Sequence, residues 1–308
     1  MNMRLTGLLC ALNLLAACVR ETPAATDTID VFTHQRAQVD VLLVVDDSRS
    51  MVDDRADLAD SYPELVELFG NSGVDWHLGV ISTDATAATS GGRLTQAGPY
   101  RWLDESTPHP SDVFAELLQS DETASASERA RSVIHDAITV HDAAFNAGFL
   151  RADAQLAVLV VSDEDDQTAS PTVGDFVPWF EQLRQVADDA TLHAMVGLPD
   201  QSCGSVAGIK HIDVAERTGG LIFDLCERDF VGAAAQITDT WSSSPFYFLS
   251  EQPQAELEVL VTEPYAEQRA LDAEAWAYNA QLNAVRITPS YRPPVGTVFE
   301  VRYAPAAP

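Results

Sequence analysis

Basic residues are scarce in this sequence, and lysine is almost missing from it. The 308 residues contain 18 Lys and Arg against 47 Asp and Glu, which gives a formal net charge of −29, and Lys210 is the only lysine. Affinity for nucleic acid depends on basic side chains that neutralise phosphates, so the composition argues against a protein that binds duplex DNA or RNA. Anionic lipid headgroups are unfavourable partners for the same reason.

Apolar side chains, in contrast, are abundant. Hydrophobic residues make up 46% of the chain. Disordered acidic chains are poor in such residues, so the sequence predicts a folded protein. The length predicts one large domain or two ordinary ones, with enough residues for a sizeable core.

Long hydrophobic runs are restricted to the N-terminus. After Arg4, residues 5–17 form a run of 13 mostly apolar residues, which is too short to span a bilayer and fits a secretory signal. The run ends in Leu15-Ala16-Ala17-Cys18, which resembles a bacterial lipobox. We therefore predict a lipoprotein signal peptide over residues 1–17 and a mature chain that begins at a lipidated Cys18. An ordinary small-residue cleavage site, with Cys18 incidental, is the alternative.

The chain also has few cysteines. Of the four, Cys10 would leave with the signal peptide and Cys18 would carry lipid, which leaves Cys203 and Cys226 as a pair. In an oxidising compartment, such a pair predicts a disulfide bond. Two free buried thiols are the alternative. A zinc site is disfavoured because no paired histidines accompany these cysteines.

The order of hydrophobic segments divides the mature chain into three parts. Residues 18–36 are predicted as a small, polar tether, and residues 37–243 alternate unbroken apolar strands, such as residues 41–45 and 156–161, with amphipathic helices. That alternation predicts an α/β fold with a doubly wound, mostly parallel sheet. Residues 246–308 contain segments that alternate with period two, which predicts a small antiparallel, β-sandwich-like module.

Acidic and hydroxyl side chains follow two of these apolar strands. Asp46, Ser48 and Ser50 stand at alternate positions after the first strand, and Asp163 follows the strand over residues 156–161. The carboxyl ends of parallel strands meet at one edge of a sheet, where ligand sites form. Hard oxygen ligands of this kind favour Mg²⁺, and Mn²⁺ or Ca²⁺ could substitute. Glu164, Asp165 and Asp166 are interpreted as a solvated loop that supports the site rather than as ligands. That one of them reaches a second, calcium-type site is the alternative.

This pattern resembles the von Willebrand factor A (VWA) domain family, whose metal-ion-dependent adhesion site (MIDAS) has D-x-S-x-S, a threonine from a second loop, and an Asp after a later strand. Asp46, Ser48, Ser50 and Asp163 match that motif, and the resemblance covers roughly residues 37–243. It implies that a hydroxyl before the helix near Ala130 completes the metal site. Ser125 is the predicted residue, with Thr123 and Ser127 as alternatives.

The segments around residues 146–151 and 162–166 also look like VWA lipoproteins of the myxobacterial type. The resemblance implies a lipid-anchored protein of the cell envelope that binds a protein or peptide ligand, through an acidic side chain of that ligand. Val19 after Cys18 favours the outer membrane. No enzyme is expected, because Gly-x-Ser-x-Gly is missing and no base is suggested for Ser48. A metal-independent structural or assembly lipoprotein and, less favoured, a metal-dependent hydrolase are the alternatives.

Overall fold

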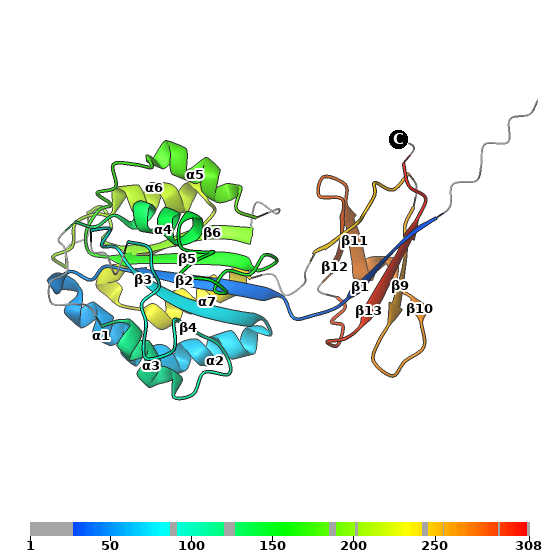
Figure 1. Cartoon of the computed structure of the whole chain (residues 1–308), viewed down its shortest axis with the longest axis horizontal. Coiled ribbons are helices and arrows are strands. Elements are labelled where there is room, and N and C mark those ends of the chain that lie inside the picture. The colour runs from blue at the N-terminus through cyan, green and yellow to red at the C-terminus, as the bar shows by residue number, and fades with distance from the viewer. Residues whose placement is uncertain are drawn as a thin grey trace, which may run out of the picture.

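The computed structural model of this chain describes residues 27–86, 91–119, 127–184, 189–200, 203–241, 246–254, 256–288 and 290–306. The predicted signal peptide, Cys18, Thr123 and Ser125 lie outside these residues. Among the helices within them, none combines the length and the apolar character that a transmembrane span requires. The described chain forms an α/β unit and a β module, which lie side by side in Figure 1.

The α/β unit is built on a six-stranded sheet. Its strands, in spatial order, are β4 (Trp102–Leu103), β3 (Asp75–Ser82), β2 (Gln38–Val45), β5 (Gln155–Ser162), β6 (Ala190–Val196) and β7 (Ile222–Asp224). All neighbouring pairs are parallel except β3 and β4. The predicted α/β class and mostly parallel sheet are therefore confirmed, and the topology is compatible with a VWA-like fold.

Helices cover both faces of this sheet. They are α1 (Val52–Asp60), α2 (Tyr62–Ser72), α3 (Pro110–Leu117), α4 (Ala130–Thr139), α5 (Val173–Glu181), α6 (Ile209–Arg217) and α7 (Phe230–Thr240), with short 3₁₀ helices η1 (Arg49–Met51) and η3 (Leu225–Glu227). Buried residues of α1, α2, α3 and α7 share one hydrophobic cluster, and those of α4, α5 and α6 share the other.

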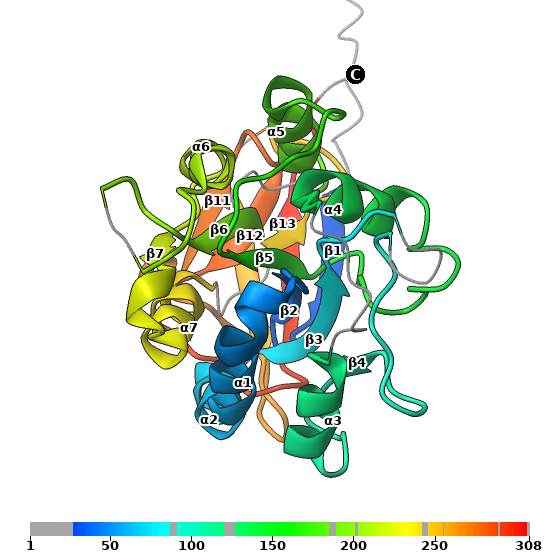
Figure 2. The same cartoon turned by 90° about the vertical axis from the view of Figure 1, so that its left-hand side faces the viewer.

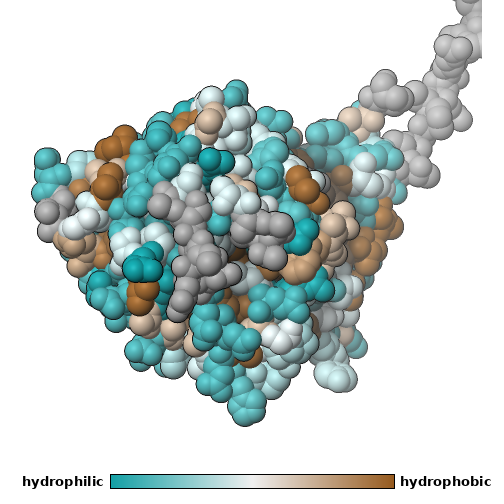
Figure 3. Space-filling view, turned by 60° about the vertical axis from the view of Figure 1, so that its left-hand side comes forward, coloured by the Kyte–Doolittle hydropathy of each residue, from teal (hydrophilic) through white to brown (hydrophobic). Residues whose placement is uncertain are grey.

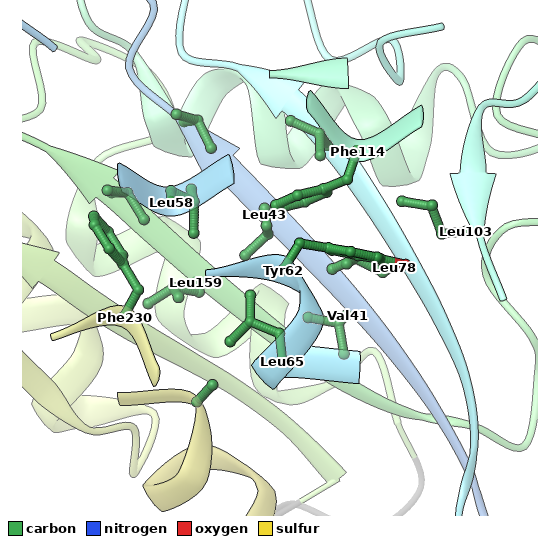
Figure 4. Packing of buried hydrophobic residues seen from close by; sticks show 14 of the residues in the cluster. Val41, Leu43, Leu58, Tyr62, Leu65, Leu78, Leu103, Phe114, Leu159 and Phe230 are labelled. Carbon is green, nitrogen blue, oxygen red and sulfur yellow. The ribbon is translucent and has the colours of Figure 1, made fainter. Parts of the chain in front are cut away.

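Strand β2 explains why two cores are needed. Val41 and Leu43 belong to the first cluster, whereas Leu42 and Val44 belong to the second. Successive side chains of a strand point to opposite faces, so an unbroken apolar strand must be covered on both sides. Figure 4 shows the first cluster, in which Leu58, Tyr62 and Leu65 of the helices lie over Val41 and Leu43 of β2.

The chain between β2 and β3 forms two consecutive α-helices. Helix α1 ends at Asp60, and α2 begins at Tyr62 with Pro63 in its first turn. Proline is well tolerated there because its missing N–H would have no partner within the helix. Helix α2 ends at Ser72 and is followed by Gly73, whose φ of 76° is the left-handed conformation that glycine adopts without strain.

The β module contains two antiparallel sheets. One has the strand order β1 (Thr28–Thr33), β13 (Val298–Tyr303), β9 (Glu258–Thr262) and β10 (Arg269–Ala270), and the other has β11 (Trp276–Asn279), β12 (Ala284–Ile287) and β8 (Phe246–Phe248), with a 3₁₀ helix η4 (Ala273–Ala275) before β11. Residues from both sheets, including Val259, Phe299 and Val285, share one hydrophobic cluster. This arrangement agrees with the predicted antiparallel module.

Strand β1 corrects the prediction for residues 18–36. Residues 28–33 were expected in a polar tether, but they form β1 and pair with β13 from Thr28–Tyr303 to Thr33–Val298. The Asp30 carboxylate accepts hydrogen bonds from the Tyr303 hydroxyl at 2.6 Å and the Ser250 amide at 2.9 Å. The β module is therefore formed from both ends of the described chain, and the α/β unit is inserted between β1 and β8.

A buried histidine in β6 predicts how the stability of the α/β unit depends on pH. His193 Nδ1 accepts a hydrogen bond from the Leu221 amide at 3.0 Å, and burial lowers its pKa from 6.5 to about 4. The unfolded chain therefore binds one more proton than the folded chain between those pH values, so the free energy of unfolding falls as pH falls through this window.

We expect His193→Asn to remove up to about 1.4 kcal/mol per pH unit of that dependence between about pH 6.5 and 4. Urea unfolding across this range measures it. The control is His109→Asn, because His109 is exposed and its left-handed backbone suits asparagine. Parallel stability curves for wild type and His193→Asn would contradict the prediction.

Candidate metal centre

The loop after β2 places a buried carboxylate at the carboxyl edge of the sheet. Asp46 has no exposed surface, and its backbone N–H donates to the Val161 carbonyl at 2.9 Å, which joins it to β5. Its Oδ1 accepts from the Ser48 amide at 2.8 Å, and its Oδ2 accepts from the Ser162 hydroxyl at 2.6 Å. Each carboxylate oxygen can accept a further interaction, so Asp46 is oriented and still able to bind a cation.

Two serine hydroxyls and a second carboxylate lie next to Asp46. The hydroxyls of Ser48 and Ser50 are 2.9 Å apart, and the Ser50 side chain is hydrogen-bonded to Asp163, which follows β5. Asp163 Oδ1 is buried without a hydrogen-bond partner. Burial, with the charges of Asp46 and Glu164, raises the pKa of Asp163. The structure therefore brings Asp46, Ser48, Ser50 and Asp163 together at one edge of the sheet.

Two further carboxylates at this edge were not predicted as site residues. The carboxylates of Asp46, Asp47 and Glu128 each have an oxygen within 4.8 Å of the other two. Burial, followed by the charges of Asp84 and Asp46, raises the pKa of Asp47, and burial with the charge of Asp46 raises that of Glu128 to about 8. Like charges and burial thus act together against ionisation in the absence of a cation.

The segment that carries Glu128 is fixed by backbone contacts. Glu128 forms a β-bridge with Asp84, and the Arg129 amide donates to the Thr83 carbonyl at 3.0 Å. The Gln167 amide donates to the Glu128 carbonyl at 2.7 Å. This segment is therefore held between the loops that follow β3 and β5, directly before α4.

An arginine of α1 forms hydrogen bonds with the backbone of the loop after β2. Arg55 Nη1 donates to the carbonyl oxygens of Asp46 and Ser48, at 3.0 Å each. Arg55 is buried in α1, and its charge lowers the pKa of Asp47 without overcoming the effect of burial. One helix side chain therefore fixes the backbone that presents Asp46, Asp47 and Ser48.

The chemistry of these groups fits a hard divalent cation. The donors are carboxylates and hydroxyls, which Mg²⁺, Mn²⁺ and Ca²⁺ prefer. Asp47 Oδ1, Glu128 Oε1 and Asp163 Oδ1 are buried without a hydrogen-bond partner. Unpartnered buried oxygens cost stability, and a bound cation would satisfy them.

The hydroxyl ligand predicted in the loop before α4 is not located by the structure. Ser125, the predicted ligand, and its alternative Thr123 lie outside the described residues. The other alternative, Ser127, is described, and its hydroxyl accepts a hydrogen bond from Arg129 Nε at 3.2 Å.

The prediction of a solvated loop over residues 164–166 is wrong for Asp166. Asp166 has no exposed surface, and its carboxylate forms an ion pair with Arg131 of α4 at 3.3 Å. Asp165 pairs with Lys210 at 3.2 Å. These partners explain why an acidic residue can be buried there. Asp165 and Asp166 therefore link the loop after β5 to α4 and α6.

The predicted disulfide is present and lies near the candidate centre. Cys203 and Cys226 are joined, which connects the loop after β6 with η3 after β7. In the first of these loops, the Val206 amide donates to the Asp163 carbonyl at 2.7 Å. On the other side of the disulfide, Arg228 pairs with Asp54 of α1 at 2.9 Å. The disulfide thus joins a loop that contacts the Asp163 loop to a segment that pairs with α1.

Comparisons with known proteins give only distant likenesses. No protein-family model matches the chain, and no curated protein sequence matches it. Among solved structures, proximal thread matrix protein 1 (PTMP1) from the mussel byssus is 12% identical, over 72% of this chain and 52% of that chain, with a TM-score of 0.43. The same protein with a zinc-occupied MIDAS motif is 13% identical, with the same coverage and TM-score.

A second neighbour is the pilus adhesin SpaC from Lactobacillus rhamnosus GG. It is 11% identical, over 90% of this chain and 41% of that chain, with a TM-score of 0.40. The chain thus spans about half the length of PTMP1 and less of SpaC. Because these TM-scores are low, the description of the fold rests on the chain's own strand order.

A divalent cation should stabilise the folded chain through this centre. We expect Mg²⁺, Mn²⁺ or Ca²⁺ to raise the melting temperature of the wild type, because a ligand that binds only the folded state adds its binding free energy to stability. Asp46→Asn, which retains a carbonyl oxygen for the Ser48 amide, should remove most of that shift. Differential scanning fluorimetry with and without EDTA measures it.

The matched control is Asp53→Asn, because Asp53 is an exposed carboxylate in the first turn of α1. It removes the same charge from the same region, so its cation-dependent shift should equal that of the wild type. A shift that persists in Asp46→Asn would contradict the assignment of the metal centre.

Proposed function

We propose that this protein binds a protein or peptide ligand through a divalent cation held at the carboxyl edge of the α/β sheet, in the manner of a VWA-domain adhesion site. The observation that carries the proposal is the convergence of Asp46, Ser48, Ser50 and Asp163 at that edge, with a buried, unpartnered oxygen on Asp163. Mg²⁺ is the proposed ion, with Mn²⁺ or Ca²⁺ as substitutes.

Each of these residues has a distinct part in such a site. The hydroxyls of Ser48 and Ser50 and the carboxylates of Asp46 and Asp163 would hold the cation, and Ser125 is the proposed hydroxyl of the second loop. The bound ion supplies a positive charge that can accept a carboxylate of the ligand. Arg55 keeps the loop in place through the carbonyls of Asp46 and Ser48.

The acidic surface affects how fast such a ligand would bind. A chain with a formal charge of −29 repels an acidic ligand at long range. Physiological salt screens charges beyond about 8 Å, so the local cation dominates once the ligand is close. Because salt screens the long-range repulsion, we expect association to become faster as salt is added.

Figure 3 shows the α/β unit from a side on which this edge is turned toward the viewer. The surface in that view is largely hydrophilic, with separate hydrophobic patches.

We further propose that the protein is anchored in the cell envelope through lipid on Cys18, with the outer membrane as the favoured location. The support is the sequence of residues 1–18 and the lone pair Cys203 and Cys226, which form a disulfide. Strand β1 lies in the β module, whereas the ends of β2 and β5 that carry the site point away from that module (Figure 1). Figure 2 views the α/β unit from this edge.

We propose binding rather than catalysis. The carboxylates and hydroxyls at this edge are accounted for as ligands of a cation in an adhesion site. A structural lipoprotein that uses no metal is disfavoured by the unpartnered oxygens of Asp47, Glu128 and Asp163.

Selection from a phage-displayed random peptide library tests the ligand-binding proposal. The protein, immobilised in Mg²⁺, should enrich peptides that share an Asp or Glu, and EDTA should release them. Asp163→Asn should retain fewer than about one tenth of the recovered peptides, because loss of one ligand charge costs at least about 1.4 kcal/mol. Asp53→Asn should retain them as the wild type does. Recovery without an acidic consensus, or recovery that EDTA leaves unchanged, would contradict the proposal.

Expression in a bacterial host with a lipoprotein pathway tests the anchor. The wild-type chain should enter the membrane fraction and carry acyl groups on Cys18 by mass spectrometry, because two or more acyl chains give stable membrane binding. Cys18→Ser should appear in the soluble fraction. An unacylated wild-type chain cut elsewhere would contradict this proposal.

A further inference from the structure

The side chain of Glu128 is the feature that the proposed adhesion site leaves unexplained. It is fully buried in a loop that the resemblance would give a neutral hydroxyl ligand. Its Oε2 accepts a hydrogen bond from the Thr83 hydroxyl, and its Oε1 has no hydrogen-bond partner. A buried oxygen without a partner in a fixed loop requires a physical explanation.

Glu128 lies close to two other carboxylates, those of Asp46 and Asp47. One oxygen each of Glu128, Asp46 and Asp47 lie within 4.8 Å of one another. Oxygens bound to one divalent cation are separated by at most two metal–oxygen bond lengths, about 4–5 Å. The three carboxylates are therefore spaced as ligands of a single ion are. Asp47 also has a buried oxygen, Oδ1, without a hydrogen-bond partner.

We propose that Glu128 is a direct ligand of the cation, acting with Asp46 and Asp47 as a set of three carboxylates. The inference rests on the proposed cation site, in which Asp46 and Asp163 are the charged ligands, and adds Glu128 and Asp47 to it. Rigid placement supports this role, because the Glu128 backbone is bridged to Asp84 and its carbonyl accepts from Gln167. The Thr83 hydroxyl donates to Oε2, and Oε1 is left without a hydrogen-bond partner, so it is available to a cation.

A charged third ligand has a consequence for the ligand that the site accepts. With Asp163, the centre then has four carboxylates, which carry more negative charge than a divalent ion neutralises. The loaded centre therefore attracts an external carboxylate less strongly than a centre with more hydroxyl ligands. Glu128 thereby favours retention of the cation at the expense of affinity for an acidic ligand.

Calorimetric titration with Ca²⁺, Mg²⁺ and Mn²⁺ tests the proposal on the whole chain. Glu128→Gln keeps the shape and an oxygen that can accept from Thr83, and we expect its affinity for the cation to fall at least about 30-fold. The matched control is Glu164→Gln, because the charge of Glu164 raises the pKa of both Glu128 and Asp163. It removes one charge from the same edge and should change the affinity less than about 3-fold.

The number of water molecules on the bound ion distinguishes ligation from a distant electrostatic effect. Tb³⁺ luminescence lifetimes in H₂O and D₂O report that number. Glu128→Ala should gain at least one water relative to the wild type, whereas Glu164→Ala should gain none. If Glu128→Gln does not fold, Glu128→Asp keeps the charge, shortens the side chain and should also weaken binding.

The outcomes separate this inference from the proposal on which it rests. Cation binding that is lost in Asp46→Asn but equal in wild type and Glu128→Gln would overturn the role of Glu128 alone, and would identify it as a buried neutral acid. Cation binding that survives in Asp46→Asn would overturn the adhesion site itself. An unchanged water count in Glu128→Ala would also overturn direct ligation.

Discussion

Parallel pairing of β2 with β3 and β5 is the interaction on which the candidate centre depends. It aligns Val45, Ser82 and Val161 at the ends of three strands, so the loops that follow all begin at one edge. Asp47 and Asp163 in those loops, and Glu128 in the segment held between two of them, have a raised pKa, because burial removes water from groups of the same charge. The hydrophobic cores on both faces hold the strands in register and so maintain this unfavourable concentration of charge.

Hydrogen bonds and ion pairs from neighbouring elements direct the charged groups at this edge. Arg55 binds the backbone after β2, and Arg131 pairs with Asp166. The Val206 amide binds the Asp163 carbonyl, in a loop that the disulfide ties to η3. These contacts fix the loops, and the charge of a bound cation would compensate the carboxylates that the loops bring together.

The sequence predicted the fold where the hydrophobic pattern was strong. Residues 41–45 and 156–161 are unbroken apolar runs, and both are central parallel strands. Strand β1 was missed because its partner β13 lies about 270 residues away, and a single edge strand with polar residues resembles a linker. Helices α6 and α7, over Ile209–Arg217 and Phe230–Thr240, were not predicted individually.

Only the candidate site residues of the D-x-S-x-S motif, and the Asp that accompanies it, could be predicted from the sequence. Asp46, Ser48, Ser50 and Asp163 belong to a recognisable motif. Glu128 belongs to no such motif, and it is held at the same edge by a β-bridge with Asp84 and by a backbone hydrogen bond from Gln167. A crystal soaked in Mn²⁺ tests the central claim most directly. The account predicts an anomalous peak in contact with carboxylate oxygens of this edge, and a Mn²⁺-saturated crystal with no peak there would contradict it.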